Sequence, residues 1–471
     1  MASASPTSAC DIAAAVRSGS SALEFVEATL ARIKKLDAKL NSFTAVTAER
    51  ARVKARAIDR ARDDGDSLGP LAGVPFAVKN LFDVAGLRTL AGSKINRSLP
   101  KSKLDSTLIE RLEAAGAILV GALNMGEYAY DFTGENVHYG PSRNPHDLKR
   151  MSGGSSGGCG SAVGGALVPL ALGSDTNGSI RVPSSLCGTF GLKPTYGRLT
   201  RARTFPFVGS LDHLGPFARN TADLAIAYDA MQGPDTADPV CTARDPELVV
   251  AELGKGTERL RLAMAGGYFQ RGLTSEAETA LNRVAEALGV TQEIELPEAE
   301  RARSAAFVIT TTEAAALHLE RLRTRAEDFD PAVRDRLLSG AMVPSAYIAV
   351  AQKFRRWYRD RILEVFQNVD AIIAPATPCP APLIGQQTFV IDGVEMPVRP
   401  NLGLFTQPIS FVGLPVTVVP IPLEPLPIGV QIIAAPWRED IALRIAAVLE
   451  RAGVARAPAP RALDGMTNAD Q

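Results

Sequence analysis

Residues 153–198 read GGSSGGCGSAVGGALVPLALGSDTNGSIRVPSSLCGTFGLKPTYGR, and this stretch decides both the fold and the chemistry of the chain. Nine glycines fall between positions 153 and 178. This is about five times the usual glycine content of roughly 7%. Glycine has no Cβ and reaches positive φ at little cost, so a glycine-dense loop lets backbone N–H groups approach a ligand closely. Such a loop typically serves an anion or an oxyanion.

Two common glycine motifs do not explain this loop. No Lys-Ser/Thr pair closes GGSSGGCG as in a P-loop, and no GxGxxG with a later acidic residue accompanies it, which argues against nucleotide binding. Residues 154–158 also fit the GxSxG elbow of an α/β-hydrolase, with Ser156 as the nucleophile. That elbow needs a preceding strand and a later histidine base, whereas RNPHDLKR (143–150) is typical of a loop and only His213 and His318 lie downstream.

The composition is that of an ordinary globular protein. The 471 residues carry 51 Lys+Arg against 51 Asp+Glu, and 46% of them are hydrophobic. A chain with zero formal net charge lacks the excess of positive charge that is typical of proteins that bind nucleic acids or anionic membranes. No basic start with an apolar run opens the chain, and prolines and Glu424 interrupt the apolar stretch 416–437. We therefore expect a cytoplasmic protein with no secretory signal and no membrane span.

Neither the cysteines nor the histidines form a metal-type or redox-type pattern. The five cysteines are scattered without a CxxC spacing, and the histidines lack ligand spacing; they stand at positions 138, 146, 213 and 318. We therefore expect no metal and no cofactor.

Short apolar runs alternate with helical patterns along most of the chain. The runs predict strands at 74–79, 118–123, 168–172, 370–375, 415–419 and 429–434. The first sixty or so residues are predicted to be mostly helical, with Ser20 and Ser21 capping an apolar stripe; further helices are predicted at 221–231, 275–288, 345–366 and 439–452. This mixture predicts one α/β domain over residues 1–455 with an N-terminal helical segment, and a disordered tail over 456–471.

A third interpretation of the loop joins three widely spaced pieces of sequence. They are Lys79 in GVPFAVKN, Ser155 in GGSSGG and Ser179 in GSDTNGSIRVPSSLCG, and FGLKPTYGR follows them. The serines are 24 residues apart, and the lysine lies 76 residues before the first of them. The pattern resembles the amidase signature family of C–N hydrolases, from about residue 20 to residue 452. The resemblance implies an α/β fold with a large mixed β-sheet covered by helices on both faces.

The resemblance also implies a Ser-Ser-Lys triad. Carried over onto this sequence, Ser179 is the nucleophile, Ser155 the bridging hydroxyl and Lys79 the base, and the Gly154–Ser155 peptide bond is cis. In similar enzymes the backbone N–H groups at and just before the nucleophile form the oxyanion hole. Here these groups belong to Thr176, Asn177, Gly178 and Ser179.

Physical chemistry supports a lysine in the role of the base. A serine hydroxyl is a poor nucleophile until an adjacent base takes its proton, and no histidine stands in a suggestive place to do so. A lysine can do it only when neutral, which requires burial to lower its pKa well below about 10.4. The apolar neighbours of Lys79 provide such surroundings; they are Val74, Phe76, Ala77 and Val78.

Two positions depart from the family pattern. Asn177 stands where the family usually has glycine; asparagine tolerates positive φ, and its side chain enters the pocket region. Gly126 stands where the family often has Asp, so the local hydrogen bonding differs there. The opposite charges of Asp175 and Arg181 flank the nucleophile turn, and we interpret them as a structural pair that holds it.

Several stretches, among them AAFVITTTEAAALHLERLR (305–323), resemble one branch of the family. That branch implies a small, anionic, urea-like amide as the substrate and the release of ammonia. A planar bidentate donor such as arginine suits a carboxylate. We therefore expect Arg321 or Arg323 to bind the carboxylate, with Tyr130, Asp131 and Asn177 on the pocket wall.

The same branch implies a short helical partner subunit, similar to the small C subunit of glutamine-dependent tRNA amidotransferases, and we expect an oligomer. Three alternatives remain open. The chain could be the A subunit of such an amidotransferase, which passes ammonia onward; an amidase for another small amide; or a non-catalytic scaffold that kept the fold. The lack of an obvious basic surface weighs against the first alternative, and the presence of all three triad residues weighs against the last.

Overall fold

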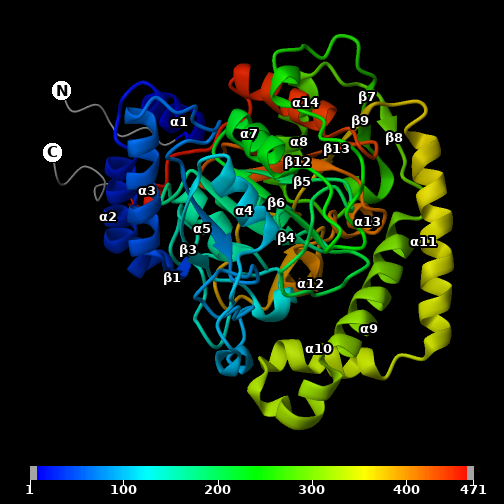
Figure 1. Ribbon diagram of the computed structural model, residues 1–471. Helices are drawn as coiled ribbons and strands as arrows, with labels where there is room; N and C mark the ends of the chain where they lie inside the picture. The colour runs from blue at the N-terminus through cyan, green and yellow to red at the C-terminus, as the bar shows by residue number, and fades with distance from the viewer. Residues whose placement is uncertain (1–7, 464–471) are drawn as a thin grey trace.

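An eleven-stranded mixed sheet runs through the middle of the protein (Figure 1). The computed structural model describes residues 8–463, and its strands lie in the order β1-β3-β2-β4-β6-β5-β12-β13-β9-β7-β8. Strand β2 pairs in parallel with β3 and β4, and β7 pairs in parallel with β8 and β9, whereas the pairs between β4 and β9 are antiparallel. The strands are β1 Phe43–Val46, β2 Pro75–Lys79, β3 Ile118–Leu123, β4 Leu170–Asp175, β5 Phe190–Lys193, β6 His213–Ala218, β7 Leu262–Ala265, β8 Glu293–Ile294, β9 Ala371–Pro375, β12 Val416–Ile421 and β13 Ile428–Ala434.

Helices cover both faces of this sheet, as expected. Every residue of β2, β3, β4, β6, β12 and β13 is buried, which requires cover on each face. The helices are α1 Ala9–Arg17, α2 Ala22–Leu40, α3 Ala48–Asp63, α4 Thr107–Ala114, α5 Gly157–Gly164, α6 Arg181–Cys187, α7 Thr221–Met231, α8 Ser275–Ala287, α9 Ala299–Arg325, α10 Pro331–Ala341, α11 Ser345–Val365, α12 Val398–Asn401, α13 Gln407–Ser410 and α14 Glu439–Arg451.

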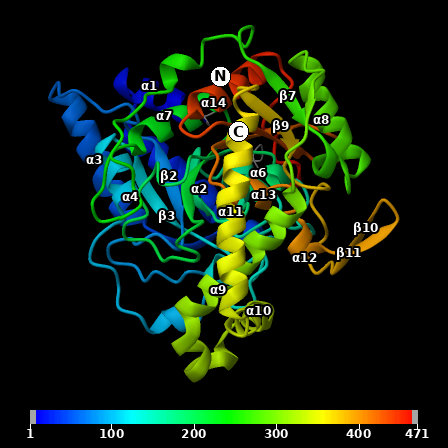
Figure 2. The ribbon, with the colours of Figure 1, turned by 90° about the vertical axis from the view of Figure 1, so that its right-hand side faces the viewer.

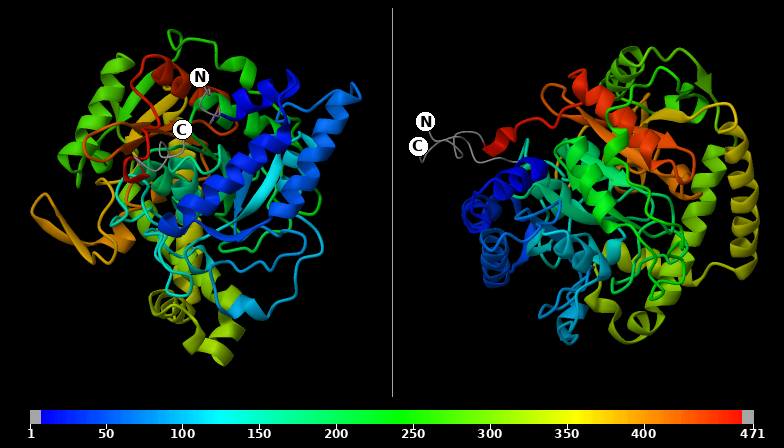
Figure 3. Two further views of the ribbon diagram at one scale, coloured as in Figure 1. Left: turned by 90° about the vertical axis from the view of Figure 1, so that its left-hand side faces the viewer. Right: turned by 45° about the horizontal axis from the view of Figure 1, so that its top comes forward.

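Two groups of helices and one hairpin lie at the sides of the molecule. Helices α9, α10 and α11 lie together on one side of the molecule, and the hairpin of β10 (Thr388–Ile391) and β11 (Val394–Pro397) projects from the body (Figure 2). Helices α1, α2 and α3 lie at the opposite side (Figures 1 and 3). Within residues 8–463, no helix is both long enough and apolar enough to cross a membrane.

The clearest sequence patterns are confirmed. The helices predicted at 221–231, 275–288, 345–366 and 439–452 are α7, α8, α11 and α14, and the six predicted strands are β2, β3, β4, β9, β12 and β13, with ends shifted by up to three residues. The N-terminal region is helical, and Ser21 caps α2 by accepting a hydrogen bond from the Glu24 N–H.

The sequence patterns do not predict α9, although its 27 residues make it longer than the other helices within 8–463. Its buried side is built from small residues rather than from a large apolar stripe, with Ala302, Ala306, Thr310 and Ala314 four residues apart. A hydrophobic periodicity therefore does not stand out, even though the helix packs closely against α10 and α11.

The predicted disordered tail is wrong for its first part. Residues 456–463 pack onto the body: Leu463 is fully buried and the Ala462 N–H donates to the Pro145 carbonyl at 3.1 Å. One aliphatic side chain with an anchored backbone is enough to order a short terminal segment, and composition alone does not reveal that anchor. The remainder of the predicted tail, 464–471, lies outside the described residues.

Candidate active site

Two parallel neighbouring strands bring a lysine and a serine together. In the register of β2 and β4, Val78 lies opposite Leu172, so the carboxyl ends of both strands meet at one edge of the sheet. Lys79 is the last residue of β2 and is fully buried. Its Nζ donates hydrogen bonds to Ser155 Oγ at 2.7 Å and to Ser174 Oγ at 2.8 Å.

Burial changes the acid–base behaviour of this amine. Desolvation lowers the pKa of Lys79 to about 7, against a smaller opposing influence of Cys159 and of the carboxylates Asp175, Asp212 and Asp131. At neutral pH about half of the population carries a neutral amine, which is the form that can accept a proton.

Ser155 lies in the glycine loop that precedes α5. The Gly154–Ser155 bond is cis, as the resemblance implied. A Cβ at position 154 would lie 2.7 Å from Asp131 Oδ2 and 2.8 Å from the Gly134 nitrogen, so only glycine fits there. The glycine loop thus packs directly against the 131–134 segment.

Ser179 lies in the turn between β4 and α6, which a buried ion pair holds. Arg181 Nη2 donates to Asp175 Oδ1 at 2.9 Å, and both side chains are fully buried. Asp175 also accepts a bond from the Ile180 N–H at 3.1 Å, and Arg181 donates to Gln431 Oε1 at 2.7 Å. Burial alone would raise the pKa of Asp175, but the charge and hydrogen bonds of Arg181 outweigh this and keep it well below its usual range. The predicted pairing of Asp175 with Arg181 is confirmed.

The backbone of this turn offers free donors. In the chain between residues 8 and 463, the N–H groups of positions 176–179 donate no hydrogen bond to the protein. Gly178 has φ 143°, and a Cβ there would lie 2.2 Å from Thr406 Oγ1, which itself donates to the Asn177 carbonyl at 2.6 Å. Thr406 thereby fixes the turn through its bond to Asn177 and its close contact with Gly178. The N–H groups of the turn remain available for an oxyanion.

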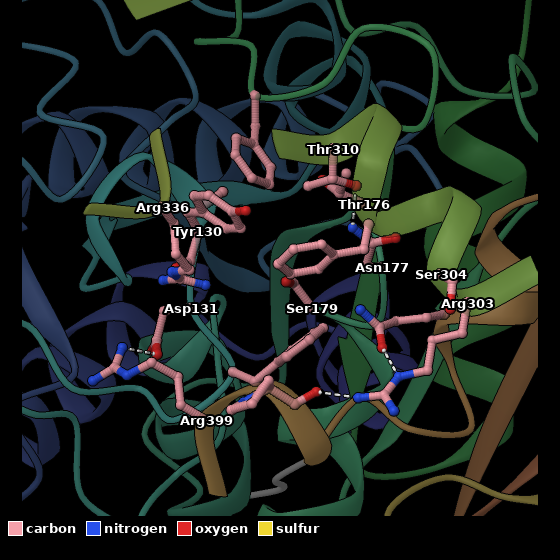
Figure 4. Close-up of a pocket in the computed structure, with 16 residues that line it drawn as sticks. Tyr130, Asp131, Thr176, Asn177, Ser179, Arg303, Ser304, Thr310, Arg336 and Arg399 are labelled. Atoms are coloured by element: carbon pink, nitrogen blue, oxygen red, sulfur yellow. Dashed lines mark hydrogen bonds and ion pairs between the residues drawn. The ribbon is translucent and has the colours of Figure 1, made fainter. Parts of the chain in front are cut away.

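A cavity of about 500 Å³ opens onto Ser179 (Figure 4). Its wall includes Tyr130, Asp131 and Asn177, the three residues expected there. The remaining lining residues come from helices α9, α10, α12 and α13 and from neighbouring loops; they are Ala129, Phe132, Thr176, Phe207, Arg303, Ser304, Phe307, Thr310, Arg336, Arg399, Pro400 and Gln407. The cavity therefore combines aromatic walls with several guanidinium groups.

Asn177 and Asp131 are both held by neighbours. Asn177 Nδ2 donates to Thr310 Oγ1 at 2.8 Å, whereas its Oδ1 is buried without a partner among residues 8–463. Asp131 accepts bonds from the Gly134 N–H at 2.7 Å and from Arg399. A Cβ at Gly126 would lie 2.5 Å from the Asp131 Cβ, so the Asp131 side chain occupies the space next to this departure from the family pattern.

The structure does not place Arg321 or Arg323 in this cavity. Arg321 stacks on Phe205, with its Cζ 5.5 Å from the ring centroid, and Arg323 is exposed. The stretch 305–323 does reach the cavity, but through its beginning, at Phe307 and Thr310. Arg321 lies 11 residues beyond Thr310, about 16 Å along the helix axis. The structure therefore places neither Arg321 nor Arg323 on the wall of this cavity, where the prediction needs one of them.

Sequence reasoning missed the arginines that do line the cavity, as well as Ser174. Arg303, Arg336 and Arg399 lie far along the chain from the serine motifs and carry no local signature. Ser174 is different, because it stands five residues before Ser179 and two residues after the predicted strand 168–172. The parallel pairing of β4 with β2 places it against Lys79.

The alternative built on Ser156 does not fit the structure. The Ser156 hydroxyl is fully buried and donates to the Ser174 carbonyl at 3.1 Å. His213 Nδ1 instead contacts the carbonyls of Asp175 and Leu211, at 3.1 and 2.6 Å. Over residues 8–463, no three His, Cys, Asp or Glu side chains gather as a metal site would require.

Comparison with known proteins agrees with this geometry. The profile of the amidase family matches residues 24–443. The chain belongs to the amidase signature family. It is a hydrolase of that family with the corresponding large mixed α/β fold.

Two relatives match this amidase over nearly its whole length. It is 52% identical over 439 residues to AtzE of Pseudomonas sp. (strain ADP), which is named as a subunit of 1-carboxybiuret hydrolase; the match covers 93% of this chain and 96% of the relative. It is 38% identical to the A subunit of the glutamyl-tRNA(Gln) amidotransferase of Chromohalobacter salexigens, over 94% of this chain and 96% of the relative.

A solved structure described as "An unexpected vestigial protein complex reveals the evolutionary origins of an s-triazine catabolic enzyme" superposes with a TM-score of 0.95 at 52% identity, covering 96% of this amidase and 100% of that chain.

Proposed function

We propose that the chain hydrolyses a small, anionic, urea-like amide, 1-carboxybiuret or a close analogue, and releases ammonia through an acyl-enzyme. One observation carries the chemistry: a fully buried lysine with a pKa near 7 donates a 2.7 Å hydrogen bond to the hydroxyl of Ser155. The identity of 52% to a protein named for 1-carboxybiuret supports the substrate.

The reaction begins with proton transfer along two hydroxyls. Neutral Lys79 takes the proton of Ser155, which in turn takes the proton of Ser179, and the Ser179 oxygen attacks the amide carbonyl. The first link of this relay is the 2.7 Å contact. The second link is the step we infer, because no hydrogen bond of Ser179 Oγ occurs within residues 8–463 and its side chain lines the cavity instead.

The remaining steps use the same residues, and the proton now moves from Lys79 back toward the substrate. The unpaired N–H groups at 176–179 bind the oxyanion of the tetrahedral intermediate, each such donor being worth about 3–4 kcal/mol. Protonated Lys79 returns its proton through Ser155 to the leaving nitrogen, which departs as ammonia. Water then attacks the Ser179 ester by the same relay and frees the enzyme.

The charge of the cavity favours an anionic substrate. Three arginines line it against a single carboxylate, that of Asp131. Asp131 is already bonded to Arg399, so a net positive charge remains for the ligand. The aromatic walls suit the flat faces of a urea-type amide.

A second candidate is the A subunit of a glutamine-dependent amidotransferase, favoured by the 38% identity over almost the whole chain. The two functions differ in substrate and in partner. Purified chain that releases ammonia from a urea-type amide without other subunits or ATP supports the hydrolase. Ammonia release from glutamine, and only when other subunits are added, supports the amidotransferase.

A partner protein is part of this proposal. Two relatives are named as subunits of larger enzymes, and the solved structure is described as a protein complex. We infer that a short helical protein binds this chain and that the assembly is oligomeric. Light scattering after size exclusion of the protein purified from its native host gives the stoichiometry. A monomer without a bound partner would reject the inference of a helical partner and an oligomer.

The test is ammonia release from a panel of amides. We expect freshly prepared 1-carboxybiuret to be turned over with a higher kcat/KM than biuret, acetanilide or glutamine. Ser179→Ala and Lys79→Ala should each lower the rate by at least about a hundredfold, as loss of a nucleophile or of a general base does. Equal turnover in the Lys79→Ala variant rejects the mechanism, and a preference for glutamine rejects the substrate.

A further inference from the structure

A buried carboxylate lies beside the nucleophile turn and takes no part in the proton relay. Asp212 directly precedes β6, which pairs antiparallel with β4. The last pair of that register joins Asp175 to His213, so the next position along places Asp212 opposite Thr176, the first residue after β4. Strand pairing thus brings this carboxylate to the turn whose N–H groups are free.

Hydrogen bonds on both oxygens hold Asp212 in place. Its Oδ1 accepts from the Thr176 hydroxyl at 2.6 Å, and its Oδ2 accepts from the N–H groups of Phe207 at 2.8 Å and Val208 at 3.0 Å. Thr176 lines the cavity that opens onto Ser179 (Figure 4), and so does Phe207. Asp212 therefore ties the turn before the nucleophile to a loop that forms another part of the cavity wall.

The same bonds indicate that Asp212 is a carboxylate rather than a neutral acid. Burial raises its pKa, but all three hydrogen bonds are donated to it, which favours the charged form. Among residues 8–463 it forms no ion pair. The positive charge of Arg201 acts on it, yet Arg201 is paired with Asp238 at 3.0 Å. The negative charge of Asp212 is therefore left largely uncompensated.

This charge acts on the buried amine of Lys79. A side cavity of about 240 Å³ is lined by Asp212 and by Ser174, which accepts a hydrogen bond from Lys79 Nζ at 2.8 Å. Burial lowers the pKa of Lys79 to about 7, while Cys159 and three carboxylates, Asp212 among them, act in the opposite direction. Burial raises the pKa of the Cys159 thiol to about 12, so this group is neutral at pH 7 and only the carboxylates act.

The other two carboxylates that act on this lysine each have an arginine partner. Asp175 pairs with Arg181, and Asp131 pairs with Arg399. In the described part of the chain, residues 8–463, Asp212 is the carboxylate of the three without such a partner. A negative charge favours the protonated amine, so Asp212 makes the lysine a stronger base than burial alone would leave it.

We propose that Asp212 is a positioning residue with two effects on the reaction: through Thr176 it holds the turn that binds the oxyanion, and through its negative charge it strengthens Lys79 as a base. The proposal rests on the proposed function for the roles of Lys79 and of the turn. Asp212 does not line the cavity that opens onto Ser179, so both effects act through other residues.

Two substitutions separate these effects. Asp212→Asn removes the charge and keeps the shape, because the amide oxygen can accept both N–H bonds and the NH₂ group can donate to the Thr176 oxygen. Thr176→Val keeps the charge and the two N–H bonds and removes only the bond from the hydroxyl. Asp229→Asn is the matched control. Asp229 on α7 also accepts from two successive N–H groups, those of residues 249 and 250, and its charge is not among those that act on Lys79.

The rate at which phenylmethanesulfonyl fluoride labels Ser179 reports on both effects and needs no knowledge of the substrate. The Ser179 oxygen displaces fluoride from the sulfur of the reagent, and its proton passes through Ser155 to Lys79. Labelling is followed by mass spectrometry of the whole protein between about pH 5.5 and pH 9, with each rate corrected for hydrolysis of the reagent.

For Asp212→Asn we expect the pH profile of labelling to move to lower pH by about half a unit or more, since removal of a nearby negative charge lowers the pKa of Lys79. For Thr176→Val we expect the labelling rate at high pH to fall by about tenfold or more, because the turn loses its anchor. Its midpoint should not move, because the lysine keeps its neighbouring charge. Asp229→Asn should leave both the midpoint and the rate at the wild-type values.

Three results overturn the proposal: an unchanged or higher midpoint in Asp212→Asn, a wild-type labelling rate in Thr176→Val, or a shift of the same size in Asp229→Asn. The proposed function fails separately. If the wild-type chain releases no ammonia from 1-carboxybiuret while the labelling profile still depends on Asp212, the substrate assignment is rejected and the role of Asp212 stands.

Discussion

Replacing Lys79 with methionine should raise the free energy of unfolding at neutral pH, and the gain should shrink as the pH rises. Lys79 is fully buried, and desolvation lowers its pKa from the ordinary 10.5 to about 7. Between these two values the unfolded chain holds a proton that the folded chain has lost. The stability of the wild type therefore rises with pH in this window, because the unfolded state binds more protons.

The size of the effect follows from the same shift. At about 1.36 kcal/mol per pKa unit, the buried lysine destabilises the fold by about 5 kcal/mol below pH 7, about 4 kcal/mol at pH 7, about 2 kcal/mol at pH 9 and nothing well above pH 10.5. Methionine removes this titration together with the Nζ hydrogen bonds to Ser155 and Ser174, worth about 1 kcal/mol each. The net gain is thus about 2 kcal/mol at pH 7 and about zero at pH 9.

Urea unfolding of both proteins at pH 7 and pH 9 measures this difference. The stability advantage of Lys79→Met should fall by about 2 kcal/mol between the two pH values. Lys103→Met is the control, because Lys103 is exposed and its replacement should give a difference that does not change with pH. An advantage of Lys79→Met that is constant from pH 7 to pH 9 would show that the lysine is charged in the folded chain, and Lys79 could not then act as a base at neutral pH.

Three further outcomes follow from the same site. The kcat/KM of the wild type should rise about tenfold from pH 6 to pH 8, since the neutral fraction of Lys79 rises through its pKa of about 7; a flat profile contradicts this. Arg181→Met leaves the buried Asp175 carboxylate without its cation. It should lower the free energy of unfolding by about 3–5 kcal/mol in thermal or urea denaturation. A loss below about 1 kcal/mol would mean that the pair does not hold the turn. Gly178→Ala pushes a methyl group into Thr406 and should cut kcat by about a hundredfold or more, and a rate within threefold of wild type would remove this turn from the oxyanion hole.

The sequence predicted the parts of the site that depend on short motifs. Lys79 ends β2 and the turn before Ser179 follows β4, two strands whose apolar runs stand out in the sequence. These strands pair in parallel, and Lys79 meets Ser155 of the glycine loop at their carboxyl ends. The catalytic roles of these residues remain a prediction. The cis bond and the ion pair of Asp175 with Arg181 lie within the same motif, and the structure confirms both.

The substrate side of the cavity could not be predicted in the same way. Its arginines come from α9, α10 and α12, which meet only because the helices pack around the end of the sheet. No periodicity or spacing in the sequence shows that Arg336 meets Tyr130, which lies about two hundred residues earlier. The sequence pointed to an arginine for the carboxylate. The structure lines the cavity with other arginines, whose positions depend on long-range packing, and Arg321 faces Phe205 instead.

The most direct test of the central claim is peptide mapping by mass spectrometry after treatment with phenylmethanesulfonyl fluoride. We expect the sulfonyl group on Ser179 alone, with labelling strongly reduced in Lys79→Ala because the hydroxyl then lacks its base. A label on Ser155 or Ser156, or undiminished labelling of Ser179 in Lys79→Ala, would contradict it.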